Sequence, residues 1–168
     1  MIRIGDYVVK MNEGVCRVDS ELLLDSYQDR RQVPYYLLLP VANDRMKVYV
    51  PVAEEYSDLR LVMDKDDAQN LIRDINGIEA TEVTNDKLRE QIYKDALKSL
   101  DPKRLVGILK CMHDRGEARL KQGKKKTAVD DRYQKLAETA LCQELGFVLK
   151  KKPDEIHEIL LAKTREGA

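Results

Sequence analysis

Histidine and cysteine are the side chains most often used for metal binding and nucleophilic catalysis. This chain of 168 residues has two histidines and three cysteines. His113 follows Cys111 by two positions, which on a helix directs the two side chains to different faces. His157, in DEIHEILL, is typical of a helix surface. We therefore expect no metal site and no cofactor.

The other reactive groups indicate no catalytic residues. NEGV is a turn rather than a glycine-rich phosphate loop, and the carboxylates lie on solvated helices where desolvation would not tune their pKa values. Cys16, Cys111 and Cys142 stand in no CxxC spacing, which indicates free thiols in a reducing cytoplasm. An enzyme that uses Cys16 is kept only as a third alternative.

A charged helix end is the most prominent polar motif. In TNDKLREQIYKDALKSL, Asn85 stands in the capping position, with Asp86 at the tip and Lys87 directly behind it. Residues 101–127 carry nine Lys and Arg against three Asp and Glu, although the formal net charge of the chain is zero. This local excess suits nucleic-acid phosphate or a solvated loop equally well, and the aspartate at the tip argues against nucleic acid.

Residues 1–62 have a β pattern. Short runs rich in Val, Leu and Tyr (DYVVK, GVCRVDSELLL, VPYYLLLPV, MKVYVPV and LRLV) are separated by turn signals such as MNEG and ANDR. KVYVPV alternates, so one face of that strand is buried and the other meets water or a partner. Five short strands predict a small, strongly bent β-barrel similar to SH3 or Tudor folds.

Residues 64–168 change to a helical period and predict an all-helical bundle of about five helices, so the class is α+β with two domains. Helices are expected over DKDDAQNLIRDIN, over TNDKLREQIYKDALKSL, and from Pro102 after the capping residue Asp101. Gly116, Gly123 and the lysine run are expected to interrupt the helical pattern.

The last two helices have their own boundary signals. Thr127 with Asp130 resembles a capping box for AVDDRYQKLAETALCQEL, Gly146 is expected at the end of that helix, and Pro153 starts the last one. The apolar face of the helix behind Asn85 is expected to hold Leu88, Ile92, Ala96, Leu97 and Leu100.

The chain has no pattern of a secreted or membrane protein. MIRIGDYVVK lacks a basic region followed by a long apolar run, so it is not typical of a secretory signal. No apolar stretch approaches the roughly 20 residues that cross a bilayer. We expect a soluble, cytoplasmic protein without a membrane partner.

The β-rich half resembles a known family. IGDYVVKMNEGVCRV, followed by YYLLLPV, MKVYVPV and LR, is similar to the N-terminal signature of CarD-family bacterial transcription regulators, a module shared with transcription-repair coupling factor. TND, KDALKSLDP, RGEARL and TAVDDRYQKLAETAL are similar to the helical half of that family in order and spacing. The resemblance therefore covers nearly the whole chain.

The resemblance implies a division of labour between the halves. Residues 1–62 would be a Tudor-like domain that binds the β subunit of bacterial RNA polymerase. Residues 64–168 would contact promoter DNA at the upstream edge of the transcription bubble. Such a protein modulates the stability of the open complex without catalysis, and we expect a monomer. An alternative is an adaptor of RNA polymerase whose helical domain binds a protein and never DNA.

Site residues follow from the same resemblance. The polymerase-facing set is Leu23, Leu24, Asp25, Arg45, Lys47 and Tyr49. An exposed sheet edge that accepts a strand from a partner agrees with this set, although the apolar members could instead fill the barrel.

The DNA-facing side departs from the family pattern. Well-studied members carry a Trp directly after TN, whereas this chain has no Trp and a gapless alignment puts Asp86 there. An aspartate cannot serve as an apolar wedge between base steps, so we expect weak contact, mostly to phosphates. The DNA-facing set is Asp86, Lys87, Arg89, Lys94, Lys98, Lys124, Lys125, Lys126 and Arg132.

Overall fold

The structure is a computed structural model that describes residues 1–54 and 58–166. The chain forms two compact units, Met1–Val62 and Met63–Ala168. The first contains a five-stranded antiparallel sheet and the second contains five α-helices, which confirms the α+β class.

The first unit is built from one sheet with the strand order β4-β3-β2-β1-β5. Its strands are β1 (Tyr7–Lys10), β2 (Gly14–Asp25), β3 (Gln32–Pro40), β4 (Val48–Pro51) and β5 (Leu59–Leu61), with a short 3-10 helix, η1 (Val52–Glu54), after β4. Asn12 and Gly14 adopt positive φ angles of 69° and 70° in the turn that joins β1 to β2. This backbone conformation is the reason for the Asn and Gly in MNEG.

One face of the sheet carries the small core of the first unit. The core residues are Ile2, Val8, Cys16, Val18, Tyr36, Leu38, Val50 and Leu59. Val50 is 1% exposed whereas its neighbour Tyr49 is 45% exposed, so the alternation predicted for KVYVPV is confirmed.

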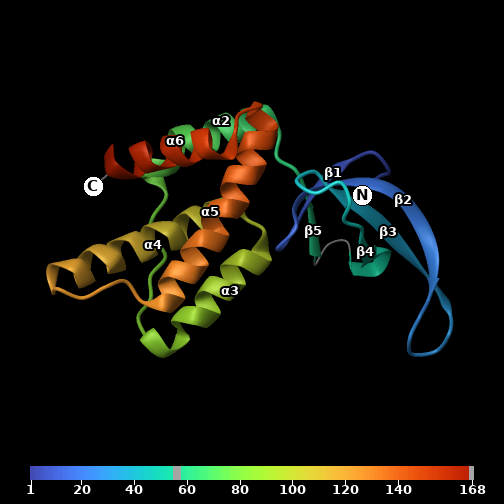
Figure 1. Ribbon diagram of the computed structural model, residues 1–168, viewed down its shortest axis with the longest axis horizontal. Coiled ribbons are helices and arrows are strands. Elements are labelled where there is room, and N and C mark those ends of the chain that lie inside the picture. Colours follow the sequence, from blue (N-terminus) through green and yellow to red (C-terminus); the bar gives the residue numbers. More distant parts are fainter. Residues whose placement is uncertain (55–57, 167–168) are drawn as a thin grey trace. The chain divides into compact units, whose positions relative to one another are not determined.

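The predicted small, bent barrel is confirmed only in part, because the five-stranded sheet of the described residues does not close. β4 pairs only with β3 and β5 pairs only with β1, and these edge strands are four and three residues long. The pairing of β2 with β3 instead continues to Asp25 opposite Gln32, whereas β1 pairs with β2 only as far as Arg17. Figure 1 shows the resulting two-stranded arm.

The second unit consists of helices whose boundaries follow local capping signals. They are α2 (Lys65–Asp74), η2 (Ile75–Gly77), η3 (Asp86–Leu88), α3 (Arg89–Ser99), α4 (Pro102–Lys121), α5 (Ala128–Leu149) and α6 (Pro153–Glu166). The Asp101 side chain accepts a hydrogen bond from the N–H of Lys103 at 2.9 Å, and Thr127 accepts one from Asp130 at 3.1 Å. These interactions confirm the caps predicted for α4 and α5.

Two glycines lie inside helices that they were expected to interrupt or end. α4 continues through Gly116, and α5 continues past Gly146 to a left-handed residue, Lys150. A Cβ atom on Gly146 would lie 2.7 Å from the carbonyl oxygen of Lys151, so this glycine lets the following chain pack back against the helix. A Cβ on Gly116 would lie 3.0 Å from Cε of Lys126. Close packing against backbone therefore explains Gly146, whereas Gly116 meets only the flexible stem of Lys126.

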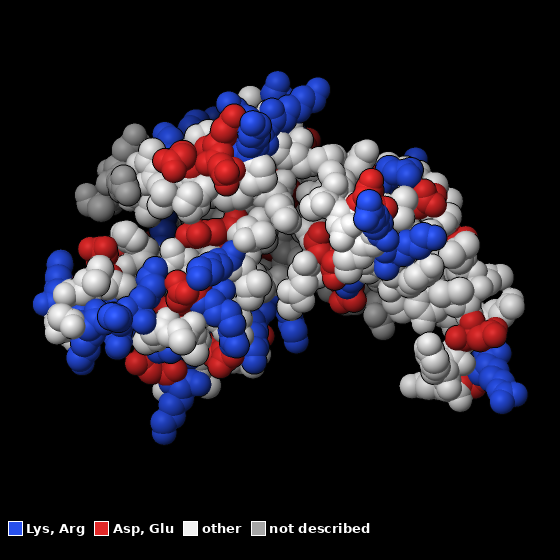
Figure 2. Space-filling model, viewed as in Figure 1, with Lys and Arg blue, Asp and Glu red and all other residues white. Residues whose placement is uncertain are grey.

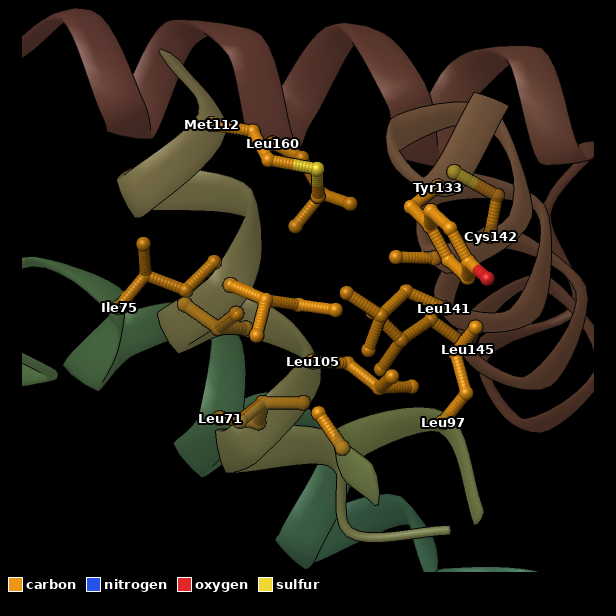
Figure 3. Packing of buried hydrophobic residues seen from close by; sticks show 14 of the residues in the cluster. Leu71, Ile75, Leu97, Leu105, Met112, Tyr133, Leu141, Cys142, Leu145 and Leu160 are labelled. Atoms are coloured by element: carbon orange, nitrogen blue, oxygen red, sulfur yellow. The ribbon is translucent and has the colours of Figure 1, made fainter. Parts of the chain in front are cut away.

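The core of the second unit draws side chains from all of its α-helices (Figure 3). Three of the five residues expected on the apolar face of α3, namely Ala96, Leu97 and Leu100, are buried, but Leu88 is 55% exposed. Tyr93, which the sequence pattern missed, is fully buried. The first turn, η3, is a 3-10 helix with about three residues per turn, so the face of α3 cannot be extrapolated back to Leu88.

Candidate functional site

The first candidate surface is the outer edge of β4. β4 is the last strand on its side of the sheet, and no strand among the described residues pairs with its other edge. Tyr49 lies opposite Leu37, which in turn lies opposite Ser20. Since paired residues of neighbouring strands share a face, Tyr49 stands on the face opposite the small core, where its ring is exposed. An unpaired edge with an exposed aromatic ring suits addition of a strand from a partner.

A second open edge lies on the two-stranded arm. Because β1 stops pairing at Arg17, the outer edge of β2 beyond that point has no strand beside it in the described structure. Leu23 in this stretch is 62% exposed, Leu24 is half-buried opposite Val33, and Asp25 is exposed.

The structure separates the six residues predicted to face the polymerase. Arg45 and Lys47 are exposed and precede β4, whose first residue, Val48, lies opposite Leu38. Leu24 lies opposite Val33 instead, five residues along β3, or about 17 Å at the usual rise of a strand. The set therefore forms two separate patches. One consists of β4 and the residues just before it, and the other lies on the arm.

The third candidate surface is the end of α3. The side chain of Asn85 accepts a hydrogen bond from the N–H of Lys87 at 3.0 Å, which confirms the predicted cap. Asp86 at the tip pairs with Arg115 of α4, with 3.0 Å between Oδ1 and Nη1. The hydrogen bond from the Arg115 guanidinium holds the pKa of the Asp86 carboxyl below its usual range. Asp86 is thus an ionised residue with a fixed partner.

The buried carboxylate of Asp130 interacts with three side chains around the start of α3. The Tyr93 hydroxyl donates a hydrogen bond to Asp130 Oδ1 at 3.0 Å, and Nε of Arg115 donates to Oδ2 at 3.4 Å. Nε of Arg89 lies 3.1 Å from Oδ1, within ion-pair distance but without hydrogen-bond geometry. Burial, followed by the nearby negative charge, raises the pKa of the Tyr93 hydroxyl. Asp86, Arg89, Tyr93, Arg115 and Asp130 are called the tip network below.

Glu90 organises the next turn of α3. It accepts hydrogen bonds from Arg132 at 2.7 Å and from the Tyr133 hydroxyl at 2.9 Å, and Lys94 lies 3.6 Å away. The Arg132 guanidinium stacks over the Tyr133 ring, 4.8 Å from its centroid. Two of the predicted DNA-facing cations, Lys94 and Arg132, therefore share one carboxylate.

The turn between α4 and α5 carries a cluster of positive charge, and Figure 2 shows Lys and Arg atoms gathered over it. Nε of Arg119 donates to the carbonyl oxygen of Lys125 at 2.7 Å, and Lys126 lies across Gly116 and donates to Gln134. Within residues 1–54 and 58–166, no carboxylate forms an ion pair with the residues called the basic turn below: Arg119, Lys124, Lys125 and Lys126.

The structure therefore divides the predicted DNA-facing residues into two groups. Lys87 and Lys98 are exposed like the lysines of the basic turn, and no described carboxylate pairs with either of them. Asp86, Arg89, Lys94 and Arg132 are paired within the second unit. The sequence interpretation missed Arg115 and Arg119, although their spacing of four on a predicted helix indicates a shared face.

Two other features, a metal-binding cluster and a membrane-spanning helix, are absent from the described residues. These residues contain no group of three or more His, Cys, Asp or Glu side chains placed to hold a metal ion. In the same residues, no helix combines the length and apolar character needed to cross a bilayer. Cys16, Cys111 and Cys142 are buried free thiols, and burial raises the pKa of Cys16 to about 11.

Comparison with known proteins places the first unit. Residues 2–63 match the family model described as the CarD-like/TRCF RID domain. No curated protein matches the chain.

Proposed function

We propose that this chain is a transcription regulator that binds the β subunit of bacterial RNA polymerase, because residues 2–63 match the CarD-like/TRCF RID domain model. The domain family is a polymerase-interacting module, and this match is the single observation that carries the proposal. The open edges of β4 and of the arm support it, since both present unpaired backbone groups beside exposed apolar side chains.

The six residues of the polymerase-facing set are assigned different roles by their positions. Tyr49 on the β4 edge is proposed as the apolar anchor of an added strand, with Arg45 and Lys47 supplying charge beside it. Leu23, with Leu24 and Asp25, is proposed to make a second, separate contact through the arm.

Binding to an isolated polymerase β-lobe fragment tests the proposal. Tyr49→Arg should weaken binding at least tenfold, because it places a charge on the added edge. Leu136→Arg is the matched control, since Leu136 is similarly exposed but belongs to α5 of the second unit. Leu23→Arg reports on the arm. Absence of binding by the folded natural protein at concentrations typical of weak interfaces would sink the polymerase assignment.

The second unit is proposed to contact promoter DNA at the upstream edge of the bubble and so to modulate the stability of the open complex. Lys87, Lys98 and the basic turn would supply phosphate contacts, because no described carboxylate neutralises them. Arg89 would contribute indirectly, since its guanidinium neutralises buried Asp130. Lys94 and Arg132 would make weaker contacts because they share Glu90.

Open-complex lifetime and footprinting on several promoters test the DNA contact. Changing Lys124–Lys126 to alanine should shorten the lifetime and remove protection at the upstream bubble edge. Changing Lys150–Lys152 is a matched control, because it removes the same charge beyond the other end of α5, about 33 Å away. Equal effects of the two triple variants would indicate a dependence on net charge alone.

The alternative is an adaptor of RNA polymerase whose second unit binds a protein. The internal pairing of Arg89, Arg115 and Arg132 with carboxylates favours this alternative, because it withdraws three cations from any DNA contact. A polymerase–promoter footprint that this protein leaves unchanged, together with intact polymerase binding, would select the adaptor.

Catalysis is not part of the proposed function. The matched domain is a polymerase-interacting module, and a regulator that acts by binding needs no catalytic residues. A nucleophilic Cys16 is also unfavourable, because its side chain is buried and its thiol stays protonated at neutral pH. Full function of Cys16→Ser would remove the third alternative.

A further inference from the structure

The guanidinium of Arg115 contacts a buried residue through one nitrogen and a surface residue through another. Its Nε donates to the fully buried Asp130, whereas its Nη1 meets Asp86, whose side chain is 72% exposed. The Arg115 side chain as a whole is 23% exposed. The buried contact fixes the direction of the guanidinium, so the group that Nη1 meets at the surface is the exchangeable one.

Several cations lie near Arg115, although the two charged side chains in contact with it, Asp86 and Asp130, are acidic. Arg119 follows Arg115 by one helical turn, and the Lys126 stem crosses the neighbouring Gly116. Between residues 115 and 127 the sequence has six Lys and Arg and one acidic residue, Glu117. Asp86 therefore brings a carboxylate from another helix to a surface on which cations outnumber acidic residues.

We propose that Asp86 acts as an internal anion that occupies Arg115 and lowers the affinity of this surface for nucleic-acid phosphate. The inference rests on the proposed DNA contact of the second unit and adds a regulatory element to it. A phosphate can take over Nη1 only by displacing Asp86, whose charge would then still lie close by and repel it. The lowered pKa of Asp86 keeps this competitor ionised at neutral pH.

Asp86→Asn tests whether Asp86 competes with phosphate for Arg115, because asparagine keeps the shape of the side chain and removes its charge. The probe is a fluorescent DNA duplex with a melted fork, titrated by anisotropy without polymerase over a series of KCl concentrations. We expect Asp86→Asn to bind roughly fivefold more tightly, as expected when an exposed ion pair no longer has to be broken. One additional phosphate contact should steepen the plot of log K against log salt by about 0.9.

Asp131→Asn is the matched control. Asp131 is an exposed aspartate in the first turn of α5, and it pairs with Lys135 at 3.0 Å rather than with Arg115. It should leave affinity and slope nearly unchanged. An equal gain in DNA affinity in the two variants would show an effect of net charge. It would overturn the proposed competition between Asp86 and phosphate.

The outcomes separate this inference from the proposed function. If the natural protein binds the forked DNA and Asp86→Asn binds no more tightly, the proposed competition by Asp86 is wrong. The proposed DNA contact of the second unit is then supported. If neither protein binds the forked DNA at low salt, the proposed DNA contact is wrong, and so is the proposed competition by Asp86. In the Asp86→Asn variant, the NMR resonance of the Arg115 Nε–H should shift on addition of DNA. A resonance that does not move would also overturn the inference.

Discussion

Glu144 of α5 accepts a hydrogen bond from the backbone N–H of Met63, 81 residues earlier in the chain, at 3.0 Å. Met63 is the first residue of the second unit, and the Glu144 side chain is 3% exposed. A buried carboxylate thus fastens the start of this unit to its longest helix. Because a buried donor without its acceptor is costly, this contact contributes to the stability of the whole bundle.

Glu144→Ala is expected to lower the free energy of unfolding by about 1–3 kcal/mol, because the Met63 N–H loses its acceptor. Urea denaturation followed by circular dichroism at the helical band measures the change. Glu158→Ala, at an exposed position of α6, should change the stability by less than about 0.5 kcal/mol. Similar losses in the two variants would contradict the role of the buried contact.

Asp130→Asn should be more destabilising. It leaves Arg89, whose side chain is only 15% exposed, without its carboxylate, and it leaves Arg115 with Asp86 alone. We expect a loss of about 3 kcal/mol in the free energy of unfolding, as for a broken buried ion pair. Denaturant titration beside Asp131→Asn measures it, and a loss below about 1 kcal/mol would show that the tip network is not a unit.

Two glycine variants should have opposite effects. Gly146→Ala places a Cβ 2.7 Å from the backbone oxygen of Lys151, and overpacking of this kind costs about 1–3 kcal/mol. Gly116→Ala meets only the flexible stem of Lys126, and alanine favours a helix by about 1 kcal/mol over glycine, so we expect a neutral or stabilising change. Thermal unfolding of both variants decides the matter. A destabilised Gly116→Ala would mean that the Lys126 stem cannot move aside.

The ion pairs of α3 predict a dependence of stability on pH. The hydrogen bond from Tyr133, with the positive charges of Lys94 and Arg132, holds the pKa of Glu90 below its ordinary value. A lowered folded-state pKa stabilises the folded protein fully above the ordinary value of about 4.3, and this contribution disappears as the pH falls through the folded-state pKa. The difference in Tm between the natural protein and Glu90→Gln should therefore be largest near pH 7 and shrink below about pH 4. A difference that stays constant with pH would contradict the ionic role of Glu90.

Local signals in the sequence predicted local structure well. Asn85, Asp101 and Thr127 cap helices as expected, because a capping side chain needs only an N–H two or three residues away. Pro153 likewise begins α6 as expected, since its missing N–H is tolerated there.

Long-range pairing was beyond the sequence patterns. Arg89 is 41 positions from Asp130, and no spacing rule indicates that one would neutralise the other. The open sheet was missed for the same reason, because strand count does not determine whether the two edge strands meet. Tyr93 was missed although its spacing from Ala96, Leu97 and Leu100 is that of a single helix face.

The tip network has a mechanical consequence. The first turn of an isolated helix frays readily, but here Asp130 and its partners join the start of α3 to α4 and α5 through side chains. A load applied to Lys87 is therefore carried by three helices together rather than by the backbone of one turn. We therefore expect the tip of α3 to keep its conformation when a partner binds to it.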